Sequence, residues 1–201
     1  MNSLAEALGM SLPGCAAIPG PYRERQQMAY LTGKRIVEMV WEDLKPRDFL
    51  SRGSFDNAIT TLMAMGGSTN AIVHLVAMAG RAGLAFPLER YNEISAKTPV
   101  IANVRPSGAK YLMEDFFYAG GLRALLFSLK DLLDLNCRTV NGRRIGENIE
   151  GAKVWNADVI LPRDKPLKAS GGIVMLRGSL APDGAVIKTS AADPKLMRHT
   201  G

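Results

Sequence analysis

Apolar residues recur at steps of three and four along much of the chain, which is the spacing of one face of an α-helix. The longest such stretch runs from Tyr22 to Leu44, and its apolar side consists of Ala29, Gly33, Ile36, Val37, Val40 and Leu44. Shorter stretches of the same kind predict further helices over 55–65, 71–79, 87–94 and 122–133. The pattern therefore predicts a helix-rich protein.

Residues with hydroxyl or carboxylate side chains stand where several of these helices begin. Ser3 and Glu6 have the Ser-x-x-Glu spacing of a capping box for a first helix over 1–9. Ser54 and Ser68 stand just before two other apolar stretches and are predicted to be their N-caps. His74 lies away from the apolar side of its helix, which favours an exposed or interface histidine over a metal ligand.

Short apolar runs bounded by proline and glycine predict strands between and after the helices. Such runs cover 99–104, 158–161, 173–176 and 185–188, and Pro182-Asp183-Gly184 predicts the turn between the last two. A buried strand followed by a glycine-containing loop and a helix is typical of α/β proteins. We predict one α/β domain over 1–162, followed by a linker and the first strands of a β-rich second domain over 163–201.

One loop carries the strongest chemical signal, and it consists of Gly66, Gly67, Ser68, Thr69 and Asn70. Glycines allow positive φ angles and close approach of another group to the main chain. The helix that follows exposes N–H groups at its positive end, which is a natural seat for a carboxylate or a phosphate. The alternative is a tight turn in which the small residues pack against a neighbouring element.

Composition and charge narrow the range of partners. The 201 residues carry a net charge of +6, which favours anionic partners such as a small organic acid or a nucleic acid. The basic residues are scattered and no aromatic stripe accompanies them, which argues against nucleic acid. No apolar run approaches the roughly 20 residues of a membrane span, and no signal peptide is evident, so a cytoplasmic protein is predicted. Cys15 and Cys137 stand alone, which predicts two buried free thiols and no metal site within the chain.

Five collinear segments resemble the dihydroxy-acid and phosphogluconate dehydratases, a family of iron–sulfur lyases. They read MNSLAEALG over 1–9, GKRIV over 33–37, MGGSTN over 65–70, YLMED over 111–115 with AGG over 119–121, and LRGSLAPDGAVIK over 176–188. The segment PSGAKYLMED over 106–115 is most similar to the branch of the family that acts on sugar acids such as arabinonate and xylonate. Because the chain begins and ends abruptly, it reads as an internal fragment of such an enzyme.

The resemblance implies a fold and a reaction. The fold is a helix-rich, three-layer domain followed by the start of a barrel-like domain. The reaction removes water from a 2,3-dihydroxy acid to give an enol that becomes a 2-keto-3-deoxy acid. In the family an iron–sulfur cluster, either 2Fe-2S or 4Fe-4S, acts as Lewis acid on the departing hydroxyl, magnesium holds the substrate, and a serine alkoxide removes the α-proton.

The family's catalytic and metal-binding residues cannot be carried over to this chain. They match positions before residue 1 or after residue 201, and neither Cys15 nor Cys137 matches a cluster ligand. The Gly66–Asn70 loop is therefore the predicted substrate-binding element, with no catalytic or metal residue assigned. Glu114 and Asp115 are adjacent in a helix that is predicted to begin at Tyr111 and to be interrupted at Gly120-Gly121, and they diverge by 100°, so we favour a structural role for each over a shared metal.

Three alternatives stay open from the sequence. The chain could belong to a dehydratase of branched-chain dihydroxy acids instead of sugar acids. It could act as a non-catalytic assembly module, since enzymes of this family are oligomers and its long helices could form an interface. It could also be a basic nucleic-acid-binding domain, which we regard as the weakest reading. For the fragment alone we predict neither a bound cluster nor turnover, with a homo-oligomer expected for the full-length enzyme.

Overall fold

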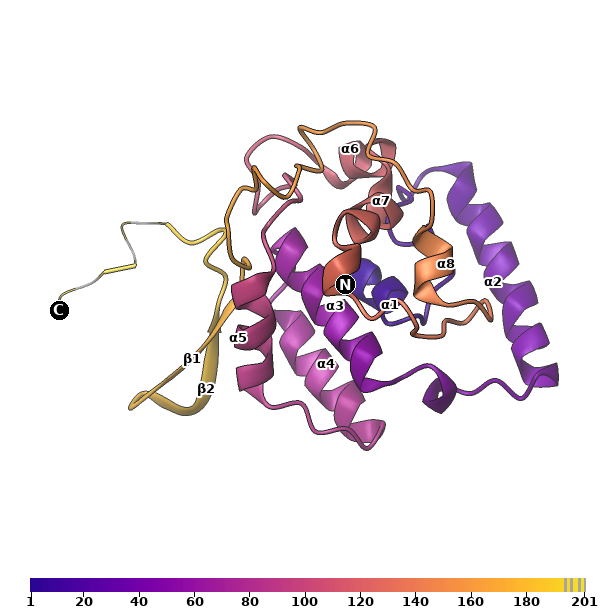
Figure 1. The fold of residues 1–201 in the computed structure, drawn as a ribbon, viewed down its shortest axis with the longest axis horizontal. Coiled ribbons are helices and arrows are strands. Elements are labelled where there is room, and N and C mark those ends of the chain that lie inside the picture. The colour runs from indigo at the N-terminus through magenta and orange to yellow at the C-terminus, as the bar shows by residue number, and fades with distance from the viewer. Residues whose placement is uncertain (194, 196, 199, 201) are drawn as a thin grey trace.

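The computed structural model describes residues 1–193, 195, 197, 198 and 200, and helices are its main regular elements (Figure 1). The α-helices are α1 (Asn2–Ala7), α2 (Arg23–Trp41), α3 (Arg52–Met65), α4 (Asn70–Arg81), α5 (Leu88–Lys97), α6 (Met113–Tyr118), α7 (Gly121–Ser128) and α8 (Ile145–Ile149). Two short 3₁₀ helices are η1 (Pro46–Asp48) and η2 (Lys130–Leu132), and two strands are β1 (Val174–Gly178) and β2 (Ala181–Ile187). The helix-rich α/β architecture that ends in a small β part agrees with the prediction.

Helix α3 is the centre of one hydrophobic core. Helix α1, helix α4, helix α5 and strand β1 contribute side chains to the same cluster around it. Phe55 and Ile59 of α3 are fully buried, and the rings of Phe55 and Phe86 lie 5.3 Å apart between centroids. Asp56 of α3 also accepts hydrogen bonds from both the Nε and an Nη of Arg90 in α5, at 3.1 and 2.7 Å. Packing and a two-point ion pair thus fix α5 against α3.

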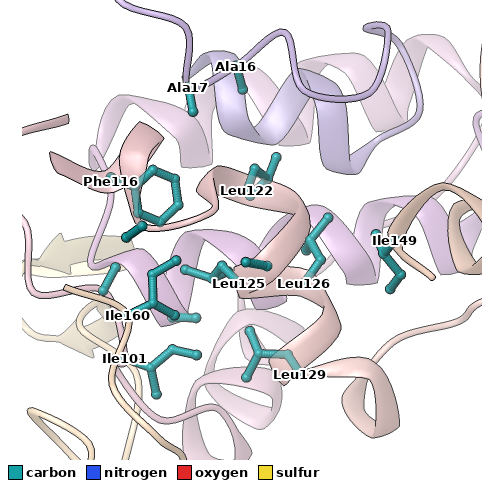
Figure 2. Packing of buried hydrophobic residues seen from close by; sticks show 14 of the residues in the cluster. Ala16, Ala17, Ile101, Phe116, Leu122, Leu125, Leu126, Leu129, Ile149 and Ile160 are labelled. Carbon is teal, nitrogen blue, oxygen red and sulfur yellow. The ribbon is translucent and has the colours of Figure 1, made fainter. Parts of the chain in front are cut away.

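A second core forms around α7, and Figure 2 shows its side chains. Leu122, Leu125, Leu126 and Leu129 are buried there, as the predicted apolar face requires, whereas Leu133 is only partly buried at its edge. Ala16 and Ala17 from the segment after α1 close this core on one side, and Ile101 and Ile160 line it on another (Figure 2). The segment 16–17 is therefore held by packing against the core around α7.

The segments predicted as strands 99–104 and 158–161 do not form strands, although most of the first is buried, as are Val159 and Ile160 of the second. Val100 bridges Lys168, Ala102 bridges Ile160, and Val104 bridges Tyr111, each as an isolated pair. Because the neighbour changes at each bridge, no continuous ladder forms. The apolar run correctly indicated burial, whereas its assignment as a strand was wrong.

The last two strands pair antiparallel, but their turn lies elsewhere than predicted. Gly178 pairs with Ala181, so the turn is Ser179-Leu180, and Pro182-Asp183-Gly184 lies inside β2. The register shifts between Leu176 and Gly178, which accommodates the proline that has no N–H to donate. The hairpin is anchored to α5, where Asn92 both donates to the carbonyl of Met175 and accepts from its N–H at 2.9 and 2.8 Å. The proposed domain boundary at 162/163 stays a prediction.

Helix α2 lies at one edge of the molecule, away from the hairpin at the other edge (Figure 1). Met39 is its only buried residue, and it packs with Phe49 and Val140 in a small third cluster. The apolar side predicted for this helix is exposed, with Val40 at 72% and its neighbour Trp41 at 85% of their maximal accessible areas. Over the described part of the chain, no helix has the length and apolar character of a membrane span.

Candidate functional site

A cavity of about 1000 Å³ opens where six parts of the chain meet. These are the start of α1 with the segment 16–20, Arg25 of α2, the end of α3 with the loop before α4, the segment 104–106, the start of α6, and the residue after β2. Its polar and charged lining consists of Asn2, Ser3, Arg25, Ser68, Thr69, Arg105, Glu114 and Lys188. Gly66, Gly67, Ser68 and Thr69 of the predicted substrate loop line this cavity, whereas Asn70 is exposed and is not among the lining residues.

Gly66 ends α3 in the left-handed region, at φ 52° and ψ 51°. Its carbonyl accepts a hydrogen bond of 2.6 Å from Ser107, and Ser107 in turn lies 3.0 Å from the hydroxyl of Ser190. A Cβ atom on Gly66 would collide with Ser107 and approach the Ser190 hydroxyl to 2.7 Å. Gly66 is therefore required both for its backbone angles and for the close approach of two serines.

The first turn of α4 satisfies more of its own N–H groups than the sequence analysis assumed. The N–H groups of Ala71 and Ile72 donate to the carbonyls of Ser68 and Thr69, each at 3.1 Å. The N–H of Asn70 donates to the Ser68 hydroxyl at 3.3 Å, although Thr69, and not Ser68, is the N-cap. Within the described residues, only the N–H groups of Ser68 and Thr69 have no protein acceptor here. An anion at this loop would meet those two N–H groups and the two hydroxyls.

Glu6 holds a segment of the cavity wall in place, a role that the sequence did not reveal. Its carboxylate accepts hydrogen bonds from the N–H groups of Gly14 and Ala16, both at 2.7 Å. The predicted capping box is wrong, because α1 has Met1 as N-cap and no side chain caps it. Burial raises the pKa of Glu6 above its ordinary value, against the lowering effect of these hydrogen bonds. Glu6 thus fixes the segment that carries Ala16, Ala17 and Ile18 to the cavity wall.

Cations outnumber anions around the cavity. Arg25, Arg105 and Lys188 line it, together with the single carboxylate of Glu114. Arg25 is held by the backbone, since its guanidinium donates to the carbonyls of Cys15 and Ile18. Glu114 accepts a hydrogen bond from the hydroxyl of Tyr22, which raises the pKa of that tyrosine. The excess of positive charge favours an anionic ligand.

The remaining candidates lie apart from one another. Asp115 accepts the N–H of Leu112 at 2.7 Å and so caps α6, while Glu114 faces the cavity. The two carboxylates therefore serve different partners, as the helical geometry predicted. His74 is exposed on α4. Ser54 is not the N-cap of α3; Ser51 is, and the two serines exchange hydrogen bonds at 2.9 and 3.2 Å.

The two cysteines are free but differ in burial. Cys137 is buried, as predicted, and burial raises the pKa of its thiol to about 11. Cys15 is only half-buried, so its prediction as a buried thiol was wrong. Within the described part of the chain, no group of three or more histidine, cysteine or acidic side chains could hold a metal ion.

The chain is thus a helix-rich α/β protein with a cavity that has more cations than anions in its lining and a glycine-serine loop at a helix start. Comparison with known sequences identifies the family. Residues 1–148 match the N-terminal profile of the dihydroxy-acid/6-phosphogluconate dehydratases, and residues 158–201 match the C-terminal profile. The chain belongs to this family.

The relatives that the chain matches include an L-arabinonate dehydratase and several dihydroxy-acid dehydratases. The chain is 52% identical to an L-arabinonate dehydratase of Rhizobium leguminosarum over 98% of its own length and 34% of the relative. It is 48% identical to a dihydroxy-acid dehydratase of Caldicellulosiruptor saccharolyticus over its whole length and 37% of the relative. A dihydroxy-acid dehydratase of Methanospirillum hungatei is 44% identical, with 36% covered. The chain thus spans about a third of the length of the relatives it matches.

Proposed function

We propose that this chain is part of a hydro-lyase that converts a 2,3-dihydroxy sugar acid, such as an aldonate, into a 2-keto-3-deoxy acid. In this reaction a proton leaves C2 and hydroxide leaves C3, and the resulting enol tautomerises to the ketone. The observation that carries the proposal is the cationic cavity at the Gly66–Thr69 loop, in a chain that matches both family profiles. The similarity to an L-arabinonate dehydratase favours a sugar acid over a branched-chain acid.

The chain's own residues would bind and orient the acid. Ser68 and Thr69 offer two N–H groups and two hydroxyls, which suit carboxylate or hydroxyl oxygens of a sugar acid. The hydrogen bond from Ser107 to the Gly66 carbonyl fixes this loop, and the hydrogen bonds of Glu6 fix the segment 14–16 on the other side of the cavity. Both are rigid supports of the kind that an ordered substrate requires. The open cavity of about 1000 Å³ is large enough for a five- or six-carbon acid.

An iron–sulfur cluster and magnesium are the cofactors that the family implies for the full-length enzyme. The cluster would supply a Lewis acid for the departing hydroxyl, and magnesium would hold the substrate. The described residues do not fit either group, because no three potential ligands come together among them. We therefore derive no step through either cofactor and assign no catalytic or metal-binding residue to this chain.

The test is an assay of the protein expressed from the complete open reading frame that encodes this chain. We expect 2-keto acid to form from arabinonate at least about tenfold faster, in kcat/KM, than from a branched-chain dihydroxy acid, a difference of about 1.4 kcal/mol. Iron and acid-labile sulfide should be present in the same preparation. A preparation with no turnover of either acid would refute the proposal, and a preference for the branched-chain acid would refute its choice of substrate.

A second role, assembly of copies, is favoured by the exposed apolar side of α2. Gly33 lies near the middle of this helix, and no other group lies within 4 Å of the position that its Cβ would occupy. Apolar residues flank it at equal spacing, with Tyr30 and Ile36 three residues away and Ala29 and Val37 four residues away. A two-fold axis at Gly33 would therefore bring like surfaces together, as an isologous dimer contact requires. The occupant we propose for this face is α2 of a second copy.

Sedimentation of the full-length protein tests this contact. Val40→Asp places a charge on the apolar side of α2, whereas Gln27→Asp places the same charge on an exposed position outside it. We expect Val40→Asp to shift the protein towards a smaller, soluble species and Gln27→Asp to leave its size unchanged. An unchanged size for Val40→Asp would refute the contact. Aggregation of Val40→Asp would refute it too, since it would show that α2 packs within one chain.

A further inference from the structure

The main chain around Lys188 is fixed by several hydrogen bonds. Its carbonyl accepts the N–H of Ala191 at 3.2 Å, which closes a turn directly after β2. The carbonyl of the next residue, Thr189, accepts from the ammonium of Lys168 at 2.7 Å. The N–H of Ser190 donates to the carbonyl of Gly172 at 3.2 Å, and the Ser190 hydroxyl lies 3.0 Å from that of Ser107. The main chain around Lys188 is thus held on both sides while its side chain lines the cavity.

The ammonium of Lys188 also has no ionic partner in the described part of the chain. No carboxylate there lies within ion-pair distance of it. The residue is half-buried, and burial lowers its pKa below the ordinary value for lysine. A partly desolvated cation without a counter-ion is unfavourable, and a bound anion would relieve that cost.

The other two cations are placed differently. Arg25 already donates to the backbone carbonyls of Cys15 and Ile18, which makes it part of the cavity wall. Arg105 is exposed and donates through Nε to the carbonyl of Ala109 at 2.9 Å. Lys188 is therefore the cation that is both partly buried and uncommitted within the described residues.

We propose that the Lys188 ammonium binds an anionic oxygen of the ligand and so gives this cavity its preference for acids over neutral polyols. The inference rests on the proposed function, because it places the acid in the cavity of the Gly66–Thr69 loop. It adds a specificity-determining residue from the segment that matches the family's C-terminal profile, residues 158–201. In this arrangement the segment after β2 completes a cavity built mainly by the helical part of the chain.

Steady-state kinetics of the full-length enzyme with arabinonate test the proposal. Lys188→Met removes the charge and keeps much of the side-chain length, Lys188→Arg keeps a cation, and Lys165→Met removes the same charge from an exposed lysine that does not line the cavity. We expect Lys188→Met to raise KM by about tenfold or more, as loss of a charged hydrogen bond should, with kcat changed less than about threefold. Lys188→Arg should recover most of the affinity, and Lys165→Met should match the wild type.

Binding to the 201-residue chain separates failure of this proposal from failure of the proposed function. We expect the wild-type chain to bind arabinonate more tightly than the neutral polyol arabinitol, and Lys188→Met to lose that preference. If the full-length enzyme turns over arabinonate but Lys188→Met leaves KM and this preference unchanged, the role of Lys188 is refuted while the function stands. If the enzyme shows no turnover yet the chain shows the Lys188-dependent preference, the function fails and Lys188 stands. If the wild-type chain does not prefer the acid, the role of Lys188 is refuted.

Discussion

Helices α2 and α3 have similar apolar periodicity and opposite surroundings. Ten of the 14 residues of α3 are buried, whereas Met39 is the one buried residue among the 19 of α2. Helix α3 is enclosed because side chains of α1, α4, α5 and β1 join its cluster. Helix α2 contacts the rest of the chain through Met39, through Arg25, which donates to the carbonyls of Cys15 and Ile18, and through Arg35, whose Nε donates to the carbonyl of Val140 at 2.5 Å.

Periodicity therefore indicates which side of a helix is apolar but not what covers that side. On α3 the apolar side is part of the core of this chain. On α2 it is exposed in this chain, and we propose that α2 of a second copy covers it. The two helices should therefore respond differently to matched substitutions, according to how closely each site is packed.

Truncation of a large aromatic side chain should give the largest contrast. Phe55 in α3 is fully buried, while Trp41 in α2 is 85% exposed. We expect Phe55→Ala to lower the free energy of unfolding by about 3–5 kcal/mol, because it leaves a cavity beside Phe86. Trp41→Ala should change it by less than about 0.5 kcal/mol. Urea denaturation of the 201-residue chain measures both, and equal losses would contradict the comparison.

A glycine-to-alanine substitution should have opposite signs in the two helices. At Gly66 the positive φ alone costs alanine about 1–2 kcal/mol, and its Cβ would also displace Ser107. At Gly33, with open space around it inside α2, alanine should stabilise the chain by about 0.5–1 kcal/mol. The same denaturation measurement applies. A stabilising Gly66→Ala would contradict the close packing of Ser107 and Ser190 against Gly66.

The smallest contrast concerns pH and two glutamates. The folded pKa of Glu6 in α1 lies above 4.5 because of burial, and that of Glu42 after α2 lies below 4.5 because Arg35 binds it. As pH rises above 4.5, Glu6 loses its proton in the unfolded chain at a lower pH than in the folded chain. The wild type should therefore lose stability relative to Glu6→Gln. As pH falls below 4.5, the folded chain keeps Glu42 ionised for longer, so the wild type should lose stability relative to Glu42→Gln. Thermal unfolding between pH 3 and 7 tests both signs, and parallel curves for either pair would contradict its assignment.

Local patterns were enough to predict most helices and the burial of the 99–104 segment. They failed where a distant group decides the structure. Glu6 was predicted to cap its own helix, but the backbone N–H groups of Gly14 and Ala16 bind it instead. The Pro182-Asp183-Gly184 turn signal was overridden by the pairing of Gly178 with Ala181.

The cavity itself could not be assembled from the sequence. Its walls come from positions as far apart as Asn2, Arg105 and Lys188, and no local pattern shows that they meet. The Ser107–Ser190 contact that fixes the loop also joins residues 83 positions apart. Family resemblance indicated the kind of ligand, whereas the choice of Lys188 required the structure.

The most direct test of the central claim is an amide NMR titration of the ¹⁵N-labelled 201-residue chain with arabinonate, with arabinitol as the neutral control. We expect arabinonate to shift the amide signals of Ser68 and Thr69, whose N–H groups have no acceptor among the described residues, and arabinitol to shift them far less. Signals of the exposed side of α2 should not move. Shifts confined to residues outside the cavity, or equal responses to the two compounds, would contradict the claim that this loop and its cations form an acid-binding site.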